Sequence, residues 1–472
     1  MLSAHTVAQV REAERRLIES TGERALMLRA ARGLADALAD VPAGAVLLVL
    51  VGPGNNGGDA LFAATHLLDR GVRVDLCLLD PDAVHADGLA AALAAGAQIV
   101  DAPSGQRHCL DALFGIGARA GLEGRAAELA AWVERERPST VAVDVPSGVG
   151  VDDGTLPGVH VPADRVVTFG THKPASVLGP AAAVGGPPVL VDIGLGPLLG
   201  PPAAEAIEPG DGALLRPFVP GGSAHKYARG VVGVVAGSPQ YAGAAHLCVA
   251  GAQAGPTGMV RFVGADSLAA RVVDRAPEVV AGWGRVQAWV VGPGAGDDAA
   301  DRLAAVLDDG VPAVVDAGAL EHLPDRLAVP ALLTPHAGEL ARMLGTERES
   351  VEADPWHHAR TAADRWDATV LLKGPRTLVV EPMGRGGRTR VNHSGTPWLA
   401  TAGAGDVLAG LAGALLAAGA DPFVAGSLAA FLHGAAAERA NPGGPITARD
   451  VARVLPSTVA AFARGTLEED TR

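Results

Sequence analysis

The chain has 472 residues, and 38 Lys or Arg against 52 Asp or Glu give it a formal net charge of −14. This length predicts two or three domains, and the acidic balance excludes a nucleic-acid or anionic-membrane surface as the main partner. The three cysteines, Cys77, Cys109 and Cys248, are widely spaced without a C-x-x-C pair, which excludes a disulfide framework and a thiolate zinc site. Charged residues stand at the N-terminus where a signal peptide would need an apolar core, so we expect a cytoplasmic protein.

The first part of the chain alternates short β-branched segments with Ala-rich helical ones. We expect buried strands at residues 45–51, 72–79, 139–145 and 164–170. This alternation is typical of a parallel sheet with helices on both faces. Prolines are dense between residues 196 and 220 and no strand pair is evident there, so we expect a linker.

The second part repeats the alternation, with strand-then-glycine segments GVVGVVAGS, MVRFVG, AWVVGPG, PAVVDAG and TVLLKGP. No unit of about 20–50 residues recurs, which favours two α/β domains over a repeat protein. The uncharged segment 407–420 is rich in Ala and Gly and too short to span a bilayer, so it predicts a buried helix.

A first candidate site follows the strand expected at residues 45–51, at GPGNNGGDA. Glycines allow the backbone to approach a ligand closely, and the helix expected at residues 61–70 would offer free N–H donors. A tight turn capped by Asp59 is the ordinary explanation, but the adjacent asparagines favour a ligand site. Two further strand ends carry Asp111 and Asp144, and carboxyl ends of parallel strands converge on one crevice.

A second candidate site is TAGAGDVLAG, a Gly-rich loop that opens an apolar helix with Asp406 at its mouth. Successive N–H groups form an anion hole for a phosphoryl group there, and a carboxylate beside it can act as a base; an ordinary helix start is the alternative. The hairpin expected at residues 371–380 places Lys373 in its turn, as a phosphate contact or a solvated residue. His336 follows another strand, as a substrate contact or a cap. No GxxxxGK[ST] loop occurs, which excludes a P-loop enzyme.

The segments GPGNNGGDA, DALFGIGA, VDVPSG and TFGTHKP, in this order, resemble the epimerase domain of NAD(P)H-hydrate repair proteins. The resemblance covers residues 1–205 and implies a Rossmann-like fold that binds hydrated nicotinamide nucleotides. It implies that K⁺ is held by Asn56, Asp111 and Ser147, and that Asp144 moves protons at the reacting carbon. Ala60 stands where the family often has glycine. The implied hydrate contacts are Asn55, Asn56, Gly57, Gly58, Asp59, Gly115, Ile116, Gly117, Ala118, Arg119, Ala120, Gly121 and Asp144.

The segments HKYARG, GSPQYAGA, GPGAG, DAGAL, TPHAGE, KGPRT and GAGD resemble the dehydratase domain of the same proteins, which has a ribokinase-like fold. This second resemblance, which we extend over residues 213–472, implies ADP-dependent dehydration to NADH or NADPH, leaving AMP and phosphate. Asp406 would accept the hydroxyl proton, and Mg²⁺ would neutralise the diphosphate. The implied hydrate contacts are Ala244, Gly296, His336 and Asp406, and the implied nucleotide contacts are Lys373, Gly374, Pro375, Arg376, Thr377 and Gly405.

Three residues depart from the dehydratase pattern: Gly318 where a second aspartate is common, Ala236 for a glycine, and Thr396 for an asparagine. The expected partners are small molecules, the two hydrates and ADP, with no nucleic acid and no membrane, and we expect a homo-oligomer. A small-molecule kinase for a vitamin precursor, with a non-catalytic N-terminal nucleotide-binding domain, is the alternative function. Such a kinase would have no use for the NNGGD segment.

Overall fold

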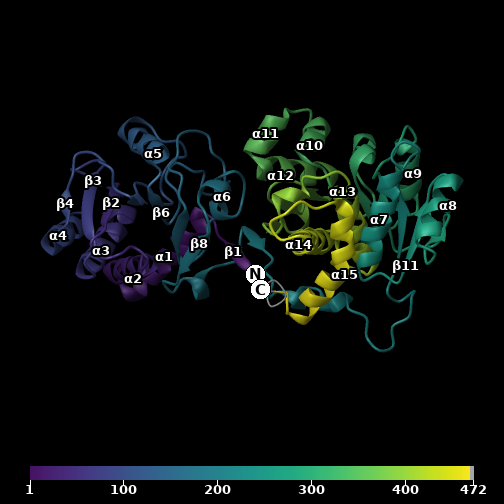
Figure 1. Ribbon diagram of the computed structural model, residues 1–472, viewed down its shortest axis with the longest axis horizontal. Coiled ribbons are helices and arrows are strands. Elements are labelled where there is room, and N and C mark those ends of the chain that lie inside the picture. The colour runs from purple at the N-terminus through teal and green to yellow at the C-terminus, as the bar shows by residue number, and fades with distance from the viewer. Residues whose placement is uncertain (468–472) are drawn as a thin grey trace. The chain divides into compact units, whose positions relative to one another are not determined.

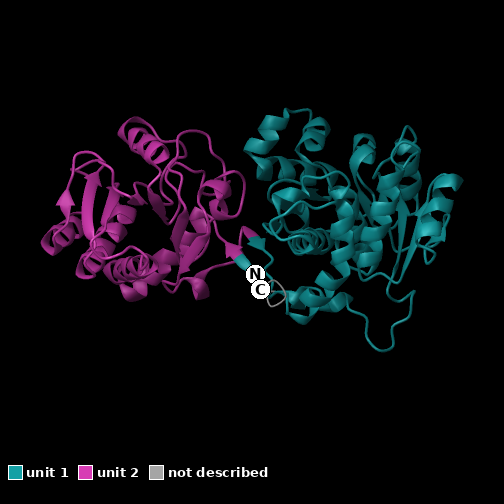
Figure 2. Ribbon diagram, viewed as in Figure 1, with its two compact units in different colours: residues 1–2, 205–472 teal, residues 3–204 magenta. Residues whose placement is uncertain are grey.

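The computed structural model describes residues 1–467 (Figure 1). The chain divides into two compact units (Figure 2). The N-terminal unit comprises Ser3–Ala204, and the C-terminal unit comprises Met1–Leu2 together with the chain from Glu205 onward. Each unit is built around its own sheet, so the expected α/β fold class is confirmed.

The N-terminal unit contains a seven-stranded parallel sheet in the order β4-β3-β2-β5-β6-β7-β8. Its strand β2 consists only of valine and leucine, because both of its faces are buried. The four strands expected from the sequence are present as β2, β3, β6 and β7. The strands are β2 (Val46–Val51), β3 (Arg73–Leu78), β4 (Gln98–Ile99), β5 (His108–Ala112), β6 (Ser139–Val143), β7 (Arg165–Phe169) and β8 (Pro188–Val191).

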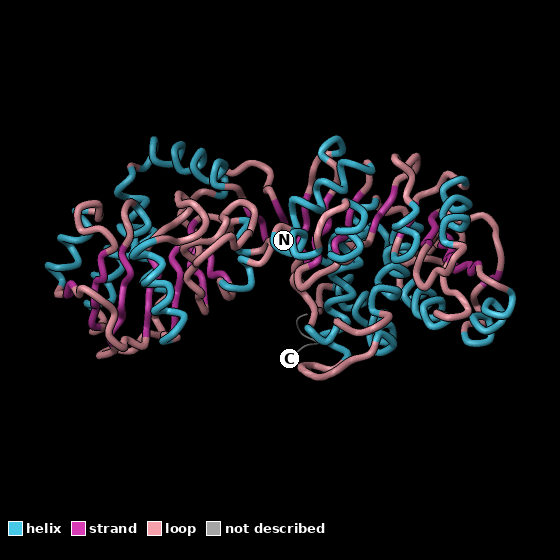
Figure 3. The backbone as a smooth tube through the Cα atoms, turned by 90° about the horizontal axis from the view of Figure 1, so that it is seen from above, coloured by secondary structure: helices cyan, strands magenta, loops and turns pink. Residues whose placement is uncertain are grey.

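Helices cover both faces of this sheet (Figure 3). Side chains alternate along β2: Leu47 and Val49 pack in the core beneath α2 and α3, while Leu48 and Leu50 pack in the core beneath α5. The helices of this unit are α1 (Val7–Thr21), α2 (Glu23–Ala37), α3 (Asn55–Asp69), α4 (Ala86–Ala95), α5 (Gly124–Glu136), α6 (Ala181–Val184), η1 (Pro174–Ser176) and η2 (Gly196–Leu198).

Helix α3 begins earlier than the sequence predicts, at Asn55 instead of residue 61. The NNGGD segment therefore forms the first turns of the helix and is not a loop. Gly54 is the N-cap, and its φ of 80° is the left-handed conformation that glycine adopts without strain. Capping by Asp59 is consequently wrong, because Asp59 lies in the second turn.

The C-terminal unit has a sheet in the order β1-β9-β18-β17-β16-β15-β14-β13-β10-β11-β12. In this order, each pair of neighbours from β16 through β15, β14, β13, β10 and β11 to β12 is parallel. Strand β17 pairs antiparallel with both of its neighbours, β16 and β18. The strands are β1 (Leu2–Ala4), β9 (Ala204–Ala206), β10 (Val231–Val235), β11 (Met259–Val263), β12 (Val280–Ala281), β13 (Ala288–Val291), β14 (Ala313–Val315), β15 (Ala331–Leu333), β16 (Thr369–Leu372), β17 (Thr377–Val380) and β18 (Thr389–Asn392).

The expected linker at residues 196–220 contains a strand, so that expectation is wrong in part. Strand β9 pairs in parallel with β18, with Glu205 opposite Arg390. The Arg390 Nε also lies 3.2 Å from Glu205 Oε2. Three residues are too short for a period-two pattern to appear in the sequence, and the pairing partner lies far along the chain.

Helices also flank the second sheet, and α13 is almost entirely buried, as the uncharged segment predicts. Among the described residues, no helix is long and apolar enough to cross a membrane. The helices are α7 (Ala242–Ala254), α8 (Asp266–Arg275), α9 (Ala299–Asp308), α10 (Ala337–Leu344), α11 (Arg348–Ala353), α12 (Pro355–Trp366), α13 (Ala404–Ala417), α14 (Pro422–Ala440), α15 (Ala448–Arg464), η3 (Gly212–Leu214), η4 (Arg216–Phe218), η5 (Ala317–His322), η6 (Met383–Arg385) and η7 (Pro397–Leu399).

Helices α7 and α13 approach closely through glycine. A Cβ on Gly410 would lie 2.0 Å from the carbonyl oxygen of Cys248, and a Cβ on Gly251 would lie 2.1 Å from that of Val407. A larger side chain at Gly410 or at Gly251 would force α7 and α13 apart and would thereby move the start of α13.

Replacing Gly410 with alanine is therefore expected to lower the free energy of unfolding by about 1–3 kcal/mol, because the helices must separate. The control is Gly243→Ala in α7, where a Cβ would meet no atom within 4 Å. That variant should be neutral or gain up to about 1 kcal/mol from helix propensity. Urea unfolding followed by tryptophan fluorescence measures both; equal midpoints would contradict the close packing.

Candidate active sites

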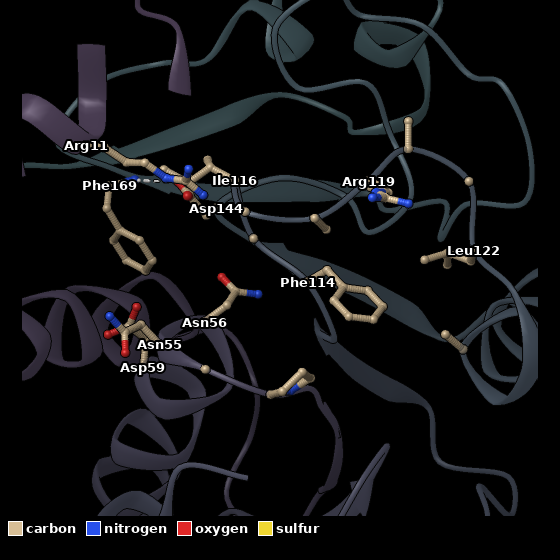
Figure 4. Close-up of a pocket in the computed structure, with 18 of the residues that line it drawn as sticks. Arg11, Asn55, Asn56, Asp59, Phe114, Ile116, Arg119, Leu122, Asp144 and Phe169 are labelled. Carbon is tan, nitrogen blue, oxygen red and sulfur yellow. Dashed lines mark hydrogen bonds between the residues drawn. The ribbon is translucent and has the colours of Figure 1, made fainter. Parts of the chain in front are cut away.

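A cavity of about 960 Å³ lies at the carboxyl ends of β2, β5, β6 and β7 (Figure 4). Most of the hydrate contacts implied by the sequence line it. Gly57 and Gly58 do not: they are buried inside α3, where a Cβ on Gly57 would lie 2.3 Å from the Gly52 carbonyl oxygen. The expected residues that line the cavity are Asn55, Asn56, Asp59, Gly115, Ile116, Gly117, Ala118, Arg119, Ala120, Gly121 and Asp144.

Asp144 directly follows β6 and is held firmly at one carboxylate oxygen. Its φ of 68° is rare for a residue other than glycine, and such strain is often stored at functional sites. Oδ1 accepts hydrogen bonds from Thr168 Oγ1 at 3.0 Å and from the Phe169 backbone N–H at 3.3 Å, and it also accepts one from the Lys173 ammonium. Within residues 1–467, no donor bonds Oδ2. This oxygen is therefore available to a ligand in the cavity.

Lys173 is a site residue that the sequence reasoning missed. Its side chain is only 1% exposed, and its Nζ donates to Thr168 Oγ1 and to the Phe169 carbonyl oxygen, both at 3.0 Å. A buried ammonium requires such a partner set, so Lys173 and Asp144 stabilise each other. The signal was present in TFGTHKP, because this segment contains the end of β7, the strand beside β6, and continues past it to Lys173.

Arg11 and Glu14 of α1 also line this cavity and were missed. Burial raises the pKa of Glu14, and the nearby Asp144 raises it further. Burial likewise raises the pKa of Asp59 well above its ordinary value, with Asp144 and Glu14 adding to the effect. Nothing in the sequence distinguishes Arg11 and Glu14 from the solvated face of an amphipathic helix.

Asp111 and Ser147 lie buried beside the cavity and bond each other. The Ser147 N–H donates to Asp111 Oδ2 at 2.8 Å, and Ser147 Oγ donates to Asp111 Oδ1 at 2.7 Å. The Phe114 N–H in turn donates to Ser147 Oγ at 3.0 Å. Burial raises the pKa of Asp111 to about 6, against the effect of the bonds from Ser147.

These residues fit a hard monovalent cation. Asn56, Asp111 and Ser147 offer oxygen atoms, which such ions prefer. The Nδ2 of Asn56 is buried without a hydrogen-bond partner, and rotation of the amide exchanges this atom with Oδ1. A Cβ on Gly115 would lie 2.9 Å from Asn56 Oδ1, so glycine leaves the amide its space.

Asp111 should make stability depend on pH in the absence of K⁺. The folded-state pKa of Asp111, about 6, exceeds the ordinary value of 3.8. The stability that Asp111 contributes to the folded state is therefore fully present below about pH 4 and is lost as pH rises through 6. Between those limits, Asp111→Asn should gain up to about 3 kcal/mol of unfolding free energy relative to the parent protein. Urea unfolding across this range measures the change, and a difference that does not vary with pH would contradict it.

A second cavity, of about 630 Å³, lies in the C-terminal unit between the β16–β17 turn, the start of α13 and the middle of α14. The hairpin expected from the sequence is confirmed, since Leu372 pairs antiparallel with Leu378. Arg376 is the one implied nucleotide contact that does not line this cavity. The residues that do are Lys373, Gly374, Pro375, Thr377 and Gly405, together with Asn392, Ser394, Thr396 and His433, among others.

Lys373 is not a solvated turn residue, because its Nζ donates to Asp316 Oδ1 at 2.8 Å. Thr334 Oγ1 donates to the same oxygen at 2.8 Å. Lys373 and Thr334 therefore orient Asp316, even though Gly318 stands where the family commonly has a second aspartate. Burial raises the pKa of Asp406 to about 6; Asp316 adds to this effect and Lys373 opposes it.

The four implied hydrate contacts of this unit do not line the second cavity. Gly296 follows β13, while Ala244 and Asp406 lie in the first turns of α7 and α13. His336 caps α10: its Nδ1 accepts from the Glu339 N–H at 3.2 Å, and Glu339 Oε2 accepts from the His336 N–H at 2.8 Å. The capping role anticipated as the alternative for His336 is thus present.

Both units place glycine-rich turns, buried carboxylates and a cavity at the carboxyl ends of parallel strands. This arrangement is characteristic of α/β proteins that bind small anionic ligands, nucleotides among them. Fold and sites therefore define a two-unit α/β protein with a separate small-molecule site in each unit.

Comparisons with known proteins agree with this class. Residues 23–175 match the family described as YjeF-related protein N-terminus, and residues 232–456 match the family described as NAD(P)H-hydrate dehydratase. The bifunctional NAD(P)H-hydrate repair enzyme Nnr of Mycobacterium tuberculosis is 42% identical over 436 residues, 88% of this chain and 89% of that protein. Its counterpart in Mycobacterium leprae is 42% identical over 466 residues, covering 93% and 94%.

The chain therefore belongs to the family of bifunctional NAD(P)H-hydrate repair enzymes. This membership does not favour the kinase alternative. Among solved structures, an ADP/ATP-dependent NAD(P)H-hydrate dehydratase from Bacillus subtilis, co-crystallised with ATP/Mg²⁺, has a TM-score of 0.48 and 27% identity, covering 52% of this chain and 93% of that one.

Proposed function

We propose that the N-terminal unit interconverts the R and S hydrates of NADH and NADPH, and that the C-terminal unit dehydrates the S hydrate with ADP. The observation that carries this proposal is the anchored Asp144, which lines the same cavity as Asn55, Asn56 and Asp59 of α3 and the 115–121 loop. Membership of the repair family supports the pairing of the two activities in one chain. The activity domains are then residues 1–205 and 213–472.

In the C-terminal unit, Asp406 accepts the proton of the hydrate hydroxyl as the β-phosphoryl group of ADP is transferred to it. Phosphate is a far better leaving group than hydroxide, so elimination then yields NADH or NADPH, with AMP as the other product. The cavity beside Gly405 and Lys373 supports nucleotide binding at this place. Backbone N–H groups at the start of α13 would stabilise the charge that develops on the phosphoryl group.

Two cations belong to this proposal. K⁺ would be held by Asn56, Asp111 and Ser147, where it would favour the binding of the anionic hydrate. Mg²⁺ would accompany ADP in the second unit and neutralise its diphosphate. We further propose that the protein works in the cytoplasm as a homo-oligomer.

The test is to incubate a mixture of NADH hydrates with the protein and follow the near-ultraviolet absorbance of reduced nicotinamide. Full recovery of absorbance is expected with ADP, and none without it. A small-molecule kinase would instead leave a stable phosphorylated alcohol, which mass spectrometry detects. Absence of ADP-dependent recovery would refute the dehydratase assignment.

The rate of ADP-dependent recovery should fall as pH drops below about 6. Asp406 acts as a base only when ionised, and burial raises its pKa to about 6. Below that value, the rate should decrease about tenfold per pH unit, and above it the rate should level off. A rate that is constant from about pH 5 to about pH 7 would remove Asp406 from this role.

A further inference from the structure

Inversion of the hydrate, as proposed above, requires proton transfer on both faces of the ring. The hydroxyl must leave from one face with a proton added, and water must add to the other face and lose a proton. A carboxyl group fixed on one wall of a cavity reaches only the face that is turned toward it. Inversion within one cavity therefore calls for two proton-transfer groups, one for each face.

Asp144 is arranged as a base. Three donors converge on its Oδ1, among them the buried Lys173 ammonium, so this oxygen is occupied. Oδ2 remains free on the cavity side. An aspartate held in this way has one open oxygen, Oδ2, through which it can take a proton from the cavity and return one to it.

Asp59 has the opposite surroundings in the same cavity. It projects from the second turn of α3, whereas Asp144 reaches the cavity from the end of β6 (Figure 4). In the described part of the chain, no N–H, hydroxyl or cationic group bonds its carboxyl. The charged groups that share the cavity are the carboxyls of Glu14, Glu123 and Asp144 and the guanidinium groups of Arg11 and Arg119.

Burial first, and then the neighbouring carboxylates, favour the protonated form of Asp59. Burial raises its pKa most, and the carboxylates of Asp144 and Glu14 raise it further. Two carboxyl groups in one cavity, one anchored by three donors and the other without a donor among the described residues, are a usual arrangement of a base and an acid in one site.

We propose that Asp59 is the proton donor and Asp144 the proton acceptor of the epimerisation, acting on opposite faces of the ring. In the first step the ring nitrogen lone pair forms a C=N bond, the C–O bond breaks, and the leaving hydroxyl takes the Asp59 proton and departs as water. In the second step water adds its oxygen to this carbon on the other face, the C=N pair returns to nitrogen, and Asp144 takes the released proton. The reverse sequence converts the other hand. When one hand is drawn off by dehydration, Asp144 releases its proton to water and Asp59 takes one up from water before the next turnover.

The experiment measures inversion and oxygen exchange separately, with each purified hydrate in ¹⁸O-labelled water, without ADP so that dehydration is silent. In Asp144→Asn, Asp59 can still expel and return the hydroxyl on its own face. This variant should incorporate ¹⁸O into one hand only, without inversion. In Asp59→Asn, inversion should fall about 10²–10⁴-fold, and any exchange should be confined to the opposite hand. Exposed Asp69, at the end of α3, gives the control Asp69→Asn, which should retain inversion.

Retained inversion in Asp59→Asn, within tenfold of the parent protein, would overturn the proposal, as would loss of exchange from both hands in Asp144→Asn. ADP-dependent dehydration of the S hydrate in the same preparation checks the C-terminal unit, and thermal unfolding followed by circular dichroism checks that the N-terminal unit of each variant is folded. Should Asp59→Asn not fold, the exchange pattern of Asp144→Asn decides alone. Failure of the parent protein to invert either hydrate would refute the epimerase function itself, an outcome distinct from these.

Discussion

Replacing Asp406 with alanine should reduce ADP-dependent return of NAD(P)H by at least about 10³-fold and leave epimerisation of the hydrate unchanged. Asp406 lies in the first turn of α13, in the C-terminal unit, whereas the cavity proposed for epimerisation is lined entirely by residues of the N-terminal unit. Without the carboxylate, the hydroxyl proton has no acceptor as the phosphoryl group is transferred. Absorbance recovery measures the first activity, and separation of the two hydrates measures the second.

The matched control is Asp301→Ala, which removes an exposed carboxylate from α9 in the same unit. It should retain both activities. Loss of both activities in Asp406→Ala, in a protein still folded by circular dichroism, would contradict two independent sites. Retention of ADP-dependent recovery would exclude Asp406 as the base.

Replacing Asp144 with asparagine in the full chain should convert the progress curve for a mixed hydrate from one phase into two. Phosphoryl transfer needs the hydroxyl aligned and within about 3–3.5 Å of phosphorus, and the two hands cannot both satisfy this in one pose. The S hydrate should therefore disappear quickly. The R hydrate should follow at the slow rate of spontaneous epimerisation. Absorbance with excess ADP records both phases.

The fast phase of this curve is an internal check that the C-terminal unit is intact. The neutral amide in Asp144→Asn would leave the buried Lys173 ammonium without its counter-charge, which destabilises a fold, so the N-terminal unit needs its own check by thermal unfolding. Pairing Asp144→Asn with Lys173→Met removes that unpaired charge and should give the same two phases. A single fast phase in either variant would mean that the N-terminal unit does not supply epimerisation.

The dehydratase cluster illustrates why the sequence identified some residues but not their partners. Asp406 was recognisable because a glycine-rich turn opens an apolar helix within a few residues. Its neighbours Asp316 and Lys373 are 57 residues apart, and their ion pair forms only because β14, β15 and β16 lie side by side. No local pattern predicts such a pair, since strand order is decided by the packing of the whole sheet.

The sequence by itself determined the α/β class, most central strands, the buried α13 helix and the glycine-rich turns, because these depend on hydrophobic periodicity and backbone freedom over a few residues. Tertiary structure alone decided that NNGGD opens a helix, that residues 204–206 form β9, and that Lys173 bonds Asp144 across 29 residues. It also decided which carboxyl groups are anchored by donors and which are isolated. Burial and the charges of distant residues set those differences, and a linear sequence records neither.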